Sequence, residues 1–281
     1  MKVKAYGKVN LALAVGGVRE DRKHDMNMIN GRVNCFDELD IQPIDRDVDE
    51  IECPGFHIPP QNTLTKTLDL LRQHGLKHHY HIHLVKNIPS QAGLGGGSAD
   101  AAALILALNE SEQLHLSLAQ MEEIGFQIGA DVPCCLHDGF THVTGAGEHV
   151  EELHVDWKIP VLLVQGVKGI STAQAFADFD EREPRDLDVD IVQDAIRKHD
   201  IGLLFQTMVN AFQPQAFEQL IELQELKEAM QDAGLVRVVM TGSGSCLMGF
   251  SVDEEVLDEA YDQLRKHYPF VFKGVIGSCS R

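Results

Sequence analysis

The sequence has little positive charge. Lysine and arginine together number 24, against 43 aspartate and glutamate residues, which gives a formal net charge of -19 over 281 residues. A surface this acidic repels a phosphodiester backbone, so we expect no nucleic-acid partner. A small anionic ligand remains compatible with the sequence, because a local pocket of backbone N–H groups with one or two lysines can oppose the overall field.

The sequence also lacks the features of export and membrane insertion. Its first ten residues, MKVKAYGKVN, contain neither an apolar core nor a small-residue cleavage site, and no apolar run approaches membrane-spanning length. Its six cysteines show no C-x-x-C spacing, and buried free thiols fit a reducing compartment better than a disulfide framework. We therefore expect a cytoplasmic protein that does not bind a membrane.

No internal repeat or low-complexity tract interrupts the chain, and its 44% hydrophobic and 24% charged residues exclude disordered and fibrous classes. Strand-like and helical patterns alternate without strict βαβ repetition. Strands are indicated at 8–15, 30–42, 79–88, 157–165 and near the C-terminus, and helices at 62–75, 116–129, parts of 172–232 and 253–267. These patterns predict an α+β protein with two domains, residues 1–153 and 154–281.

Residues 89–108, PSQAGLGGGSADAAALILAL, contain four glycines within five residues, directly before an alanine-rich helix. A glycine cluster marks backbone with positive φ or a place where another group must approach closely. The N-terminus of a helix offers unpaired N–H groups and a favourable dipole to an anion. The segment therefore predicts a phosphate-binding loop, with a tight turn needed only for packing as the alternative.

Three familiar glycine motifs do not fit this loop. No lysine follows the glycines as a Walker A motif requires, and Ser98 stands where the dinucleotide fingerprint has its third glycine. The loop enters a helix, whereas the glycine loop of protein kinases connects two strands. The remaining interpretation is a loop around a nucleoside triphosphate, in which the Ser98 hydroxyl could meet a phosphate or Mg²⁺.

The segment PSQAGLGGGSADAAA resembles the P-x-x-x-G-L-G-G-G-S-A-D signature of the GHMP kinase superfamily, which includes galacto-, homoserine, mevalonate and phosphomevalonate kinases. Three further segments are similar to that superfamily in the expected order: AYGKVNLALAVGGVREDRKHDM, IGADVPCCLHDGFTHVTGAGEHV and MTGSGSCLMGF. The resemblance covers nearly the whole chain and is closest to the 4-diphosphocytidyl-2-C-methyl-D-erythritol kinases. It implies an N-terminal ribosomal-protein-S5-like domain and a C-terminal ferredoxin-like domain.

The resemblance implies an ATP-dependent kinase that phosphorylates the 2-hydroxyl of 4-diphosphocytidyl-2-C-methyl-D-erythritol in non-mevalonate isoprenoid biosynthesis, with ATP and Mg²⁺ as cofactors, as a monomer or homodimer. It implies that Asp131 is the catalytic base and that Lys8 lies beside it. Its implied ATP-binding residues are Gly93, Leu94, Gly95, Gly96, Gly97, Ser98, Ala99, Asn62, Lys86, Gly242, Ser243 and Gly244, with Ser98 also a Mg²⁺ ligand. Its implied substrate-binding residues are Asn10, Lys23, His24, Thr172 and Phe176.

The residues taken alone leave alternatives open. Asp131 could cap a helix after Gly129, Lys8 could be a surface lysine, and Phe176 could be a core aromatic. Histidines 79, 81 and 83 share one strand face, but no separate cluster of ligands completes a metal site. Lys23 stands where the family motif has a tyrosine, which makes a kinase with a different alcohol acceptor one alternative. A non-catalytic nucleotide-binding protein of the same fold is another.

Overall fold

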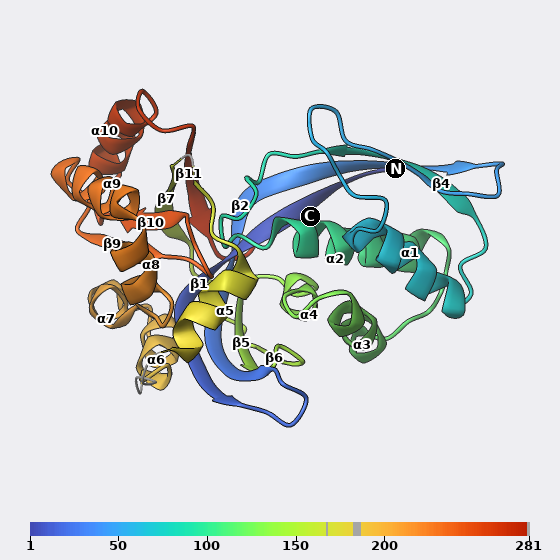
Figure 1. Cartoon of the computed structure of the whole chain (residues 1–281), viewed down its shortest axis with the longest axis horizontal. Coiled ribbons are helices and arrows are strands. Elements are labelled where there is room, and N and C mark those ends of the chain that lie inside the picture. The colour runs from blue at the N-terminus through green and yellow to red at the C-terminus, as the bar shows by residue number, and fades with distance from the viewer. Residues whose placement is uncertain (167, 182–186, 280–281) are drawn as a thin grey trace.

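The computed structural model describes residues 1–166, 168–181 and 187–279, which form two halves that lie side by side (Figure 1). The strands are β1 (Lys2–Val18), β2 (His24–Ile44), β3 (Glu50–Glu52), β4 (His79–Val85), β5 (Phe140–Gly145), β6 (His149–Glu152), β7 (Ile159–Gln165), β8 (Val209–Asn210), β9 (Arg237–Met240), β10 (Leu247–Phe250) and β11 (Phe270–Ile276). The helices are α1 (Thr63–Gln73), α2 (Gly96–Ser111), α3 (Leu118–Ile128), α4 (Val132–Cys135), α5 (Thr172–Asp180), α6 (Asp190–Arg197), α7 (Ile201–Thr207), α8 (Gln213–Gln219), α9 (Ile221–Asp232) and α10 (Glu254–Leu264).

A long antiparallel pair, β1 with β2, forms the centre of the N-terminal half. β2 also pairs with β4 and β5, and the register between β1 and β2 shifts between Tyr6 and Lys8. At that shift Gly7 lies against the loop before α2, and the N–H of Lys8 donates to the carbonyl of Leu94 at 3.0 Å. The irregularity in β1 therefore brings Lys8 to the glycine loop.

Helix α2 packs on β1, and α1 and α3 pack beside it (Figure 1). Its buried residues include Ala99, Ala101 and Ala102, whose small side chains let the helix backbone approach the sheet closely. Helices α1 and α3 begin at capping boxes formed by Asn62 and Ser117, which satisfy N–H groups that have no partner within the helix. Helices α1 and α3 hold α2 in place.

The C-terminal half is built on four antiparallel strands in the order β11-β7-β10-β9. Strand β7 is buried on both faces: Leu162 and Val164 join the same apolar cluster as residues of α9 and α10, while Val161 and Leu163 join the cluster that contains residues of α6. Burial on both faces explains why the sequence of β7, IPVLLVQ, is an almost continuous apolar run. Ile276 of β11 pairs with Val33 of β2, so the strands of both halves belong to one sheet.

The α+β class expected from the sequence is confirmed by this mixture of helices and antiparallel strands. The strands at the N-terminus are longer than the pattern indicated, because β1 and β2 continue past the alternating core. The expected domain boundary at 153/154 falls in the connection between β6 and β7 and stays a prediction. Within the described ranges, no helix combines the length and apolar character needed to cross a bilayer.

Candidate active site

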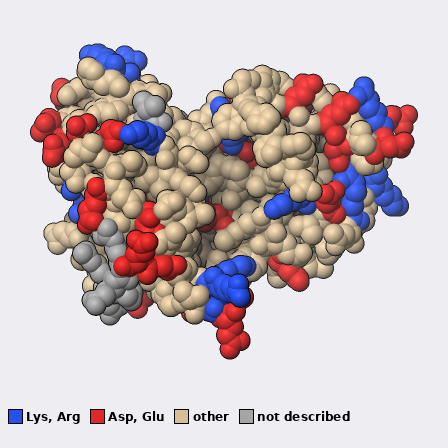
Figure 2. All heavy atoms as spheres, in the orientation of Figure 1, with Lys and Arg blue, Asp and Glu red and all other residues tan. Residues whose placement is uncertain are grey.

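A cavity of about 980 Å³ lies between the two halves of the molecule. Figure 2 shows the hollowed face, where most of the side chains that border the hollow are uncharged. The wall nevertheless contains both charge signs, from Lys8, Arg22, Lys23, Lys86, Asp100, Asp131 and Asp180. Basic groups thus line part of the cavity of this acidic protein, where they can favour an anion locally.

The glycine loop forms one side of the cavity. Gly93 and Gly95 have φ angles of +74° and +66°, a conformation that favours glycine. Gly95 is the N-cap of α2, so Gly96 and Gly97 are its first residues and have no positive φ. Of the two reasons expected for a glycine cluster, positive φ therefore does not apply to Gly96 and Gly97. A Cβ on Gly96 would lie 3.0 Å from a methyl of Ile88, so packing is what restricts that position.

The second glycine turn comes from the C-terminal half and packs directly on the first. A Cβ on Gly93 would overlap the carbonyl oxygen of Thr241, and a Cβ on Gly242 would lie 2.8 Å from the Cα of Gly93. Gly242 itself has a φ of +55°. The Ser243 hydroxyl lies 3.1 Å from that of Thr172, at the start of α5. The two turns meet backbone to backbone because neither carries a side chain at the contact.

Lys8 and Asp131 form an ion pair on the cavity wall, with Lys8 Nζ 3.4 Å from Asp131 Oδ2. The Lys8 side chain is only 8% exposed, so it is not a surface lysine, while that of Asp131 is 37% exposed. Burial lowers the pKa of Lys8, but the charge of Asp131, the neighbouring cysteines and a hydrogen bond to Asp131 outweigh it, so the pKa is raised above 10.5. Lys8 therefore stays charged at neutral pH.

Asp131 occupies the N-cap position of α4, but its side chain accepts no capping hydrogen bond from the described residues of that helix. Pro133 lies in the first turn of α4 and fits the start of a helix, where its missing N–H has no intrahelical partner in any case. The carboxylate is thus left free to face Lys8 and the cavity. The missing hydrogen bond argues against the interpretation of Asp131 as a helix cap.

Lys86 is held between two buried carboxylates, those of Asp37 and Asp100, which are 0% and 4% exposed. Its Nζ donates to Asp37 and, at 2.7 Å, to Asp100. Burial lowers the pKa of Lys86, but the two carboxylates raise it above 10.5 overall. Burial raises the pKa of Asp100 from 3.8 to about 7. The charge of Lys86 lowers this pKa, and the charge of Asp37 raises it further.

The opposite wall is aromatic. The imidazole of His24 stacks on Phe176, with ring centroids 5.0 Å apart and planes at 18°. His24 Nε2 lies 3.1 Å from Asp180 Oδ1. Two residues of α5 therefore contact the imidazole, Phe176 at its face and Asp180 at its edge. Lys23 Nζ lies 4.1 Å from the ring centroid of Phe126, a cation–π distance. Phe176 therefore presents an aromatic surface to the cavity and is not enclosed in the core.

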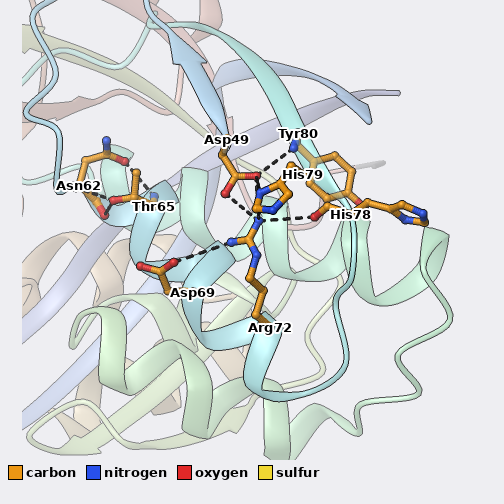
Figure 3. Close-up of polar contacts among 8 residues, drawn as sticks. All are labelled: Asp49, Asn62, Thr65, Asp69, Arg72, His78, His79 and Tyr80. Atoms are coloured by element: carbon orange, nitrogen blue, oxygen red, sulfur yellow. Dashed lines mark hydrogen bonds and ion pairs between the residues drawn. The ribbon is translucent and has the colours of Figure 1, made fainter. Parts of the chain in front are cut away.

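Asn62 lies on the cavity wall, where its amide oxygen accepts from the N–H groups of Leu64 and Thr65 at the start of α1 (Figure 3). In the last turn of α1, Arg72 donates to Asp49, which also accepts from the N–H of Tyr80, as Figure 3 shows. The histidines of β4 and the residue before it pair with carboxylates: His78 with Glu112, His79 with Asp49, and His81 and His83 with Glu52. Among the described residues, no group of histidines, cysteines and acids could hold a metal ion.

The structure thus brings most of the expected site residues to one cavity. Those on its wall are Lys8, Lys23, His24, Asn62, Lys86, Gly93, Leu94, Gly95, Gly96, Gly97, Ser98, Asp131, Thr172, Phe176, Gly242 and Ser243. The described wall does not include Ala99, Gly244 or Asn10. Asn10 is fully buried behind Lys8, and its amide is bonded to Lys8 and Asn30.

Sequence reasoning did not identify Asp37, Asp100 or Asn30. Asp100 belongs to the quoted loop segment, and its place one helical turn after Gly96 was a usable signal. Asp37 and Asn30 lie within β2, in a run that the sequence indicates only as a strand. Their roles depend on residues far along the chain, which no local pattern contains.

The matched family models divide the chain in two. The model described as GHMP kinases N terminal domain matches residues 62–139, and the one described as GHMP kinases C terminal matches residues 192–269. The first match contains the glycine loop and Asp131, whereas Lys8 precedes it. The two matched segments lie in different halves of the molecule.

Two curated relatives are named 4-diphosphocytidyl-2-C-methyl-D-erythritol kinase. The chain is 31% identical over 276 residues to the protein from Clostridium tetani, covering 97% of this chain and 98% of that one. It is 33% identical over 277 residues to the protein from Thermoanaerobacter pseudethanolicus, covering 97% and 94%. A crystal structure of 4-(cytidine 5'-diphospho)-2C-methyl-D-erythritol kinase is 27% identical, with a TM-score of 0.82 over 99% of this chain and 100% of that chain. Mevalonate kinase of L. major, crystallised with R-mevalonate, has a TM-score of 0.77 at 16% identity over 100% and 97%, which shows the shared fold alone.

Proposed function

Because the chain belongs to the GHMP kinase family and is an ATP-dependent small-molecule kinase, we propose that it phosphorylates the 2-hydroxyl of 4-diphosphocytidyl-2-C-methyl-D-erythritol. The observation that carries the proposal is the Lys8–Asp131 pair on the wall of the cavity that also contains the glycine loop. A base, a cation and a phosphate-binding helix start in one cavity are the groups that phosphoryl transfer to an alcohol requires.

In the proposed reaction, the acceptor oxygen attacks the γ-phosphorus of ATP while its proton passes to the Asp131 carboxylate. The bond between the γ-phosphorus and the β,γ-bridging oxygen breaks, and ADP leaves with that bond's electron pair. The charged Lys8, 3.4 Å from Asp131, stabilises negative charge that develops on the attacking oxygen and on the transferring group. Because Asp131 is the more exposed partner, the acceptor reaches the carboxylate first.

The phosphate end of the site has the features of an anion cradle. The first residues of α2 have N–H groups without partners in the helix, and Gly93 and Gly95 let the loop backbone approach a phosphate closely. Mg²⁺ in kinases is held mainly by substrate phosphates with one or two protein ligands. The Ser98 hydroxyl, on the cavity wall, fits one place in that donor set, and the ion would neutralise charge on the phosphates.

The acceptor end supports a cytidine compound in two ways. The stacked pair of His24 and Phe176 provides a flat aromatic wall for a pyrimidine base, and Arg22 and Lys23 provide charge for a diphosphate. The relatives' names describe a kinase of the same compound. A second candidate is a GHMP kinase with a different alcohol acceptor. The contact of Lys23 with Phe126 favours it, because a lysine in that place offers no aromatic face for a base.

The direct test is ADP release by the purified protein with Mg-ATP and each of five acceptors: the cytidine compound, mevalonate, phosphomevalonate, homoserine and galactose. We expect saturable release with the cytidine compound alone. Asp131→Asn is the matched control, because it removes the base and keeps the shape of the site. Release with another alcohol and none with the cytidine compound would replace the proposed acceptor with the second candidate. The cytoplasmic location and the monomeric or homodimeric state expected from the sequence remain predictions.

A further inference from the structure

Three polar side chains form a row across the sheet behind Lys8. Asn10 of β1 is the direct antiparallel partner of Asn30 of β2, which in turn is the direct partner of Thr141 of β5. Directly opposed residues of antiparallel strands project from the same face. All three are buried. Polar groups in such a place are expected to be fully hydrogen-bonded.

The hydrogen bonds along this row have a single direction, which the charge of Lys8 sets. An ammonium group only donates, so Lys8 Nζ donates to Asn10 Oδ1 at 2.8 Å. The amide nitrogen of Asn10 must then face the other way, and it donates to Asn30 Oδ1 at 2.6 Å. By the same reasoning the amide nitrogen of Asn30 points away from Asn10. Among the described residues, this buried nitrogen meets no hydrogen-bond acceptor.

A small cavity lies beside the row. Its volume is about 10 Å³, and its wall includes Lys8, Asn30, Arg32 and Thr141. A space of this size corresponds to one water molecule, which needs two to four polar partners. Asn30 Nδ2 supplies a donor, and the Thr141 hydroxyl can donate or accept. The size, the polar wall and the unpaired donor all match the same small ligand.

We propose that this cavity holds one water molecule and that Asn30 is a positioning residue for Lys8, acting through Asn10. The water accepts from Asn30 Nδ2 and donates to the cavity wall. Each amide that donates at its nitrogen becomes a better acceptor at its oxygen, so the water strengthens the Asn30–Asn10 bond and then the Asn10–Lys8 bond. The row thereby fixes the ammonium group toward Asp131. Asn10 is likewise assigned a positioning role, because both ends of its amide are occupied.

The inference rests on the kinase activity but not on the identity of the acceptor. Its structural test is a crystal structure of the whole chain at a resolution that resolves ordered water. We expect one water within hydrogen-bonding distance of Asn30 Nδ2 in the wild-type protein. A cavity without water, or an Asn30 amide whose nitrogen donates to a protein group, would overturn the proposal. This outcome is independent of whether the proposed cytidine acceptor is correct.

The functional test compares two asparagines of β2. Asn30→Leu removes the acceptor of Asn10, so we expect kcat to fall about tenfold, the scale of one hydrogen bond to a charged group, with KM for ATP unchanged. The alkaline limb of the kcat–pH profile should move to lower pH, because Asn30 no longer holds in place the Asn10 oxygen that favours the charged form of Lys8. Asn34→Leu is the control: Asn34 Oδ1 accepts from the N–H of Val275 at 2.8 Å, away from Lys8.

We expect Asn34→Leu to lower stability while leaving kcat and its pH profile as in the wild type. If Asn30→Leu does not fold, Thr141→Val is the second variant, because it keeps the shape of the wall and removes one partner of the water. It should lower kcat two- to threefold, roughly the effect of a weakened neutral hydrogen bond, with the same direction of pH shift. Equal pH profiles for the wild type and the position-30 or position-141 variants would contradict the positioning role.

Discussion

Lys8 and Lys86 are two lysines on the wall of one cavity, and both have a raised pKa despite burial. They differ in their counter-ions. Asp131, beside Lys8, is partly exposed to the cavity, whereas Asp37 and Asp100, on either side of Lys86, are almost completely buried. A pair with one exposed member can meet a substrate, while a lysine enclosed by two carboxylates is fixed in the structure. The exposure of the carboxylate separates the two roles.

Removing the exposed carboxylate should have the largest effect on activity. We expect Asp131→Asn to lower kcat by about 10²- to 10⁴-fold, the usual contribution of a general base, with the dissociation constant of ATP nearly unchanged. The measurement is steady-state ADP release together with ATP titration of the free protein. A kcat within threefold of the wild type would show that Asp131 is not the base.

Removing the enclosed lysine should instead affect folding. Lys86→Met leaves two buried carboxylates without their cation, and we expect it to lower the free energy of unfolding by about 3–5 kcal/mol. Lys8→Met is the matched variant, because it leaves a carboxylate that can still reach water. Urea denaturation of both proteins measures the difference. Equal destabilisation would remove the distinction between the two lysines.

Stability should also depend on pH through Asp100. Its pKa is about 7 in the folded protein against an ordinary value of 3.8, so the folded state binds this proton more tightly than the unfolded state does. That contribution to stability is complete below pH 3.8 and is lost as pH rises through about 7. Between pH 6 and 8, we expect the wild type to lose on the order of 1 kcal/mol relative to Asp100→Asn. Parallel curves of unfolding free energy against pH would contradict this assignment.

A third lysine that lines the cavity, Lys23, extends the comparison, because its neighbour is the ring of Phe126. We expect Lys23→Tyr to lower KM for the cytidine compound by about three- to tenfold, the range of one aromatic contact. Lys23→Met removes the charge without adding a ring and serves as the control. If the tyrosine and methionine variants have the same KM, stacking does not occur at this position.

The structure confirms the expected glycine turn before a helix, because that signal is local, while phosphate binding there stays a prediction. Gly93, Gly95 and the start of α2 lie within one short segment, so residue spacing alone indicates a helix with an anion site. The helix begins at Gly96, two residues earlier than a loop containing all four glycines would require, so positive φ does not explain Gly96 or Gly97. The position of a helix start within one residue depends on packing, here against Ile88.

The approach of Lys8 to Asp131 could be expected only from the resemblance to a known family. More than one hundred positions separate the two residues, and the pair forms because the shift in β1 and the start of α4 meet at α2. Asp37 shows the same limit: it accepts from the N–H groups of Asn87 and Ile88 and from Lys86. A buried aspartate within a strand has no local pattern that identifies its distant partners.

The contact between Gly93 and Gly242 has a consequence for protein synthesis. The glycine loop is completed by a turn about 150 positions later in the chain, and the N–H groups of Ser245 and Cys246 donate from that turn to the carbonyls of Gln91 and Ala92. At about 5–20 residues per second, the ribosome needs roughly ten seconds or more to add that interval. During this time the nascent N-terminal half has Lys8 and its own glycines but lacks the second glycine turn. If the cavity binds ATP as proposed, the growing chain cannot use that binding to stabilise itself.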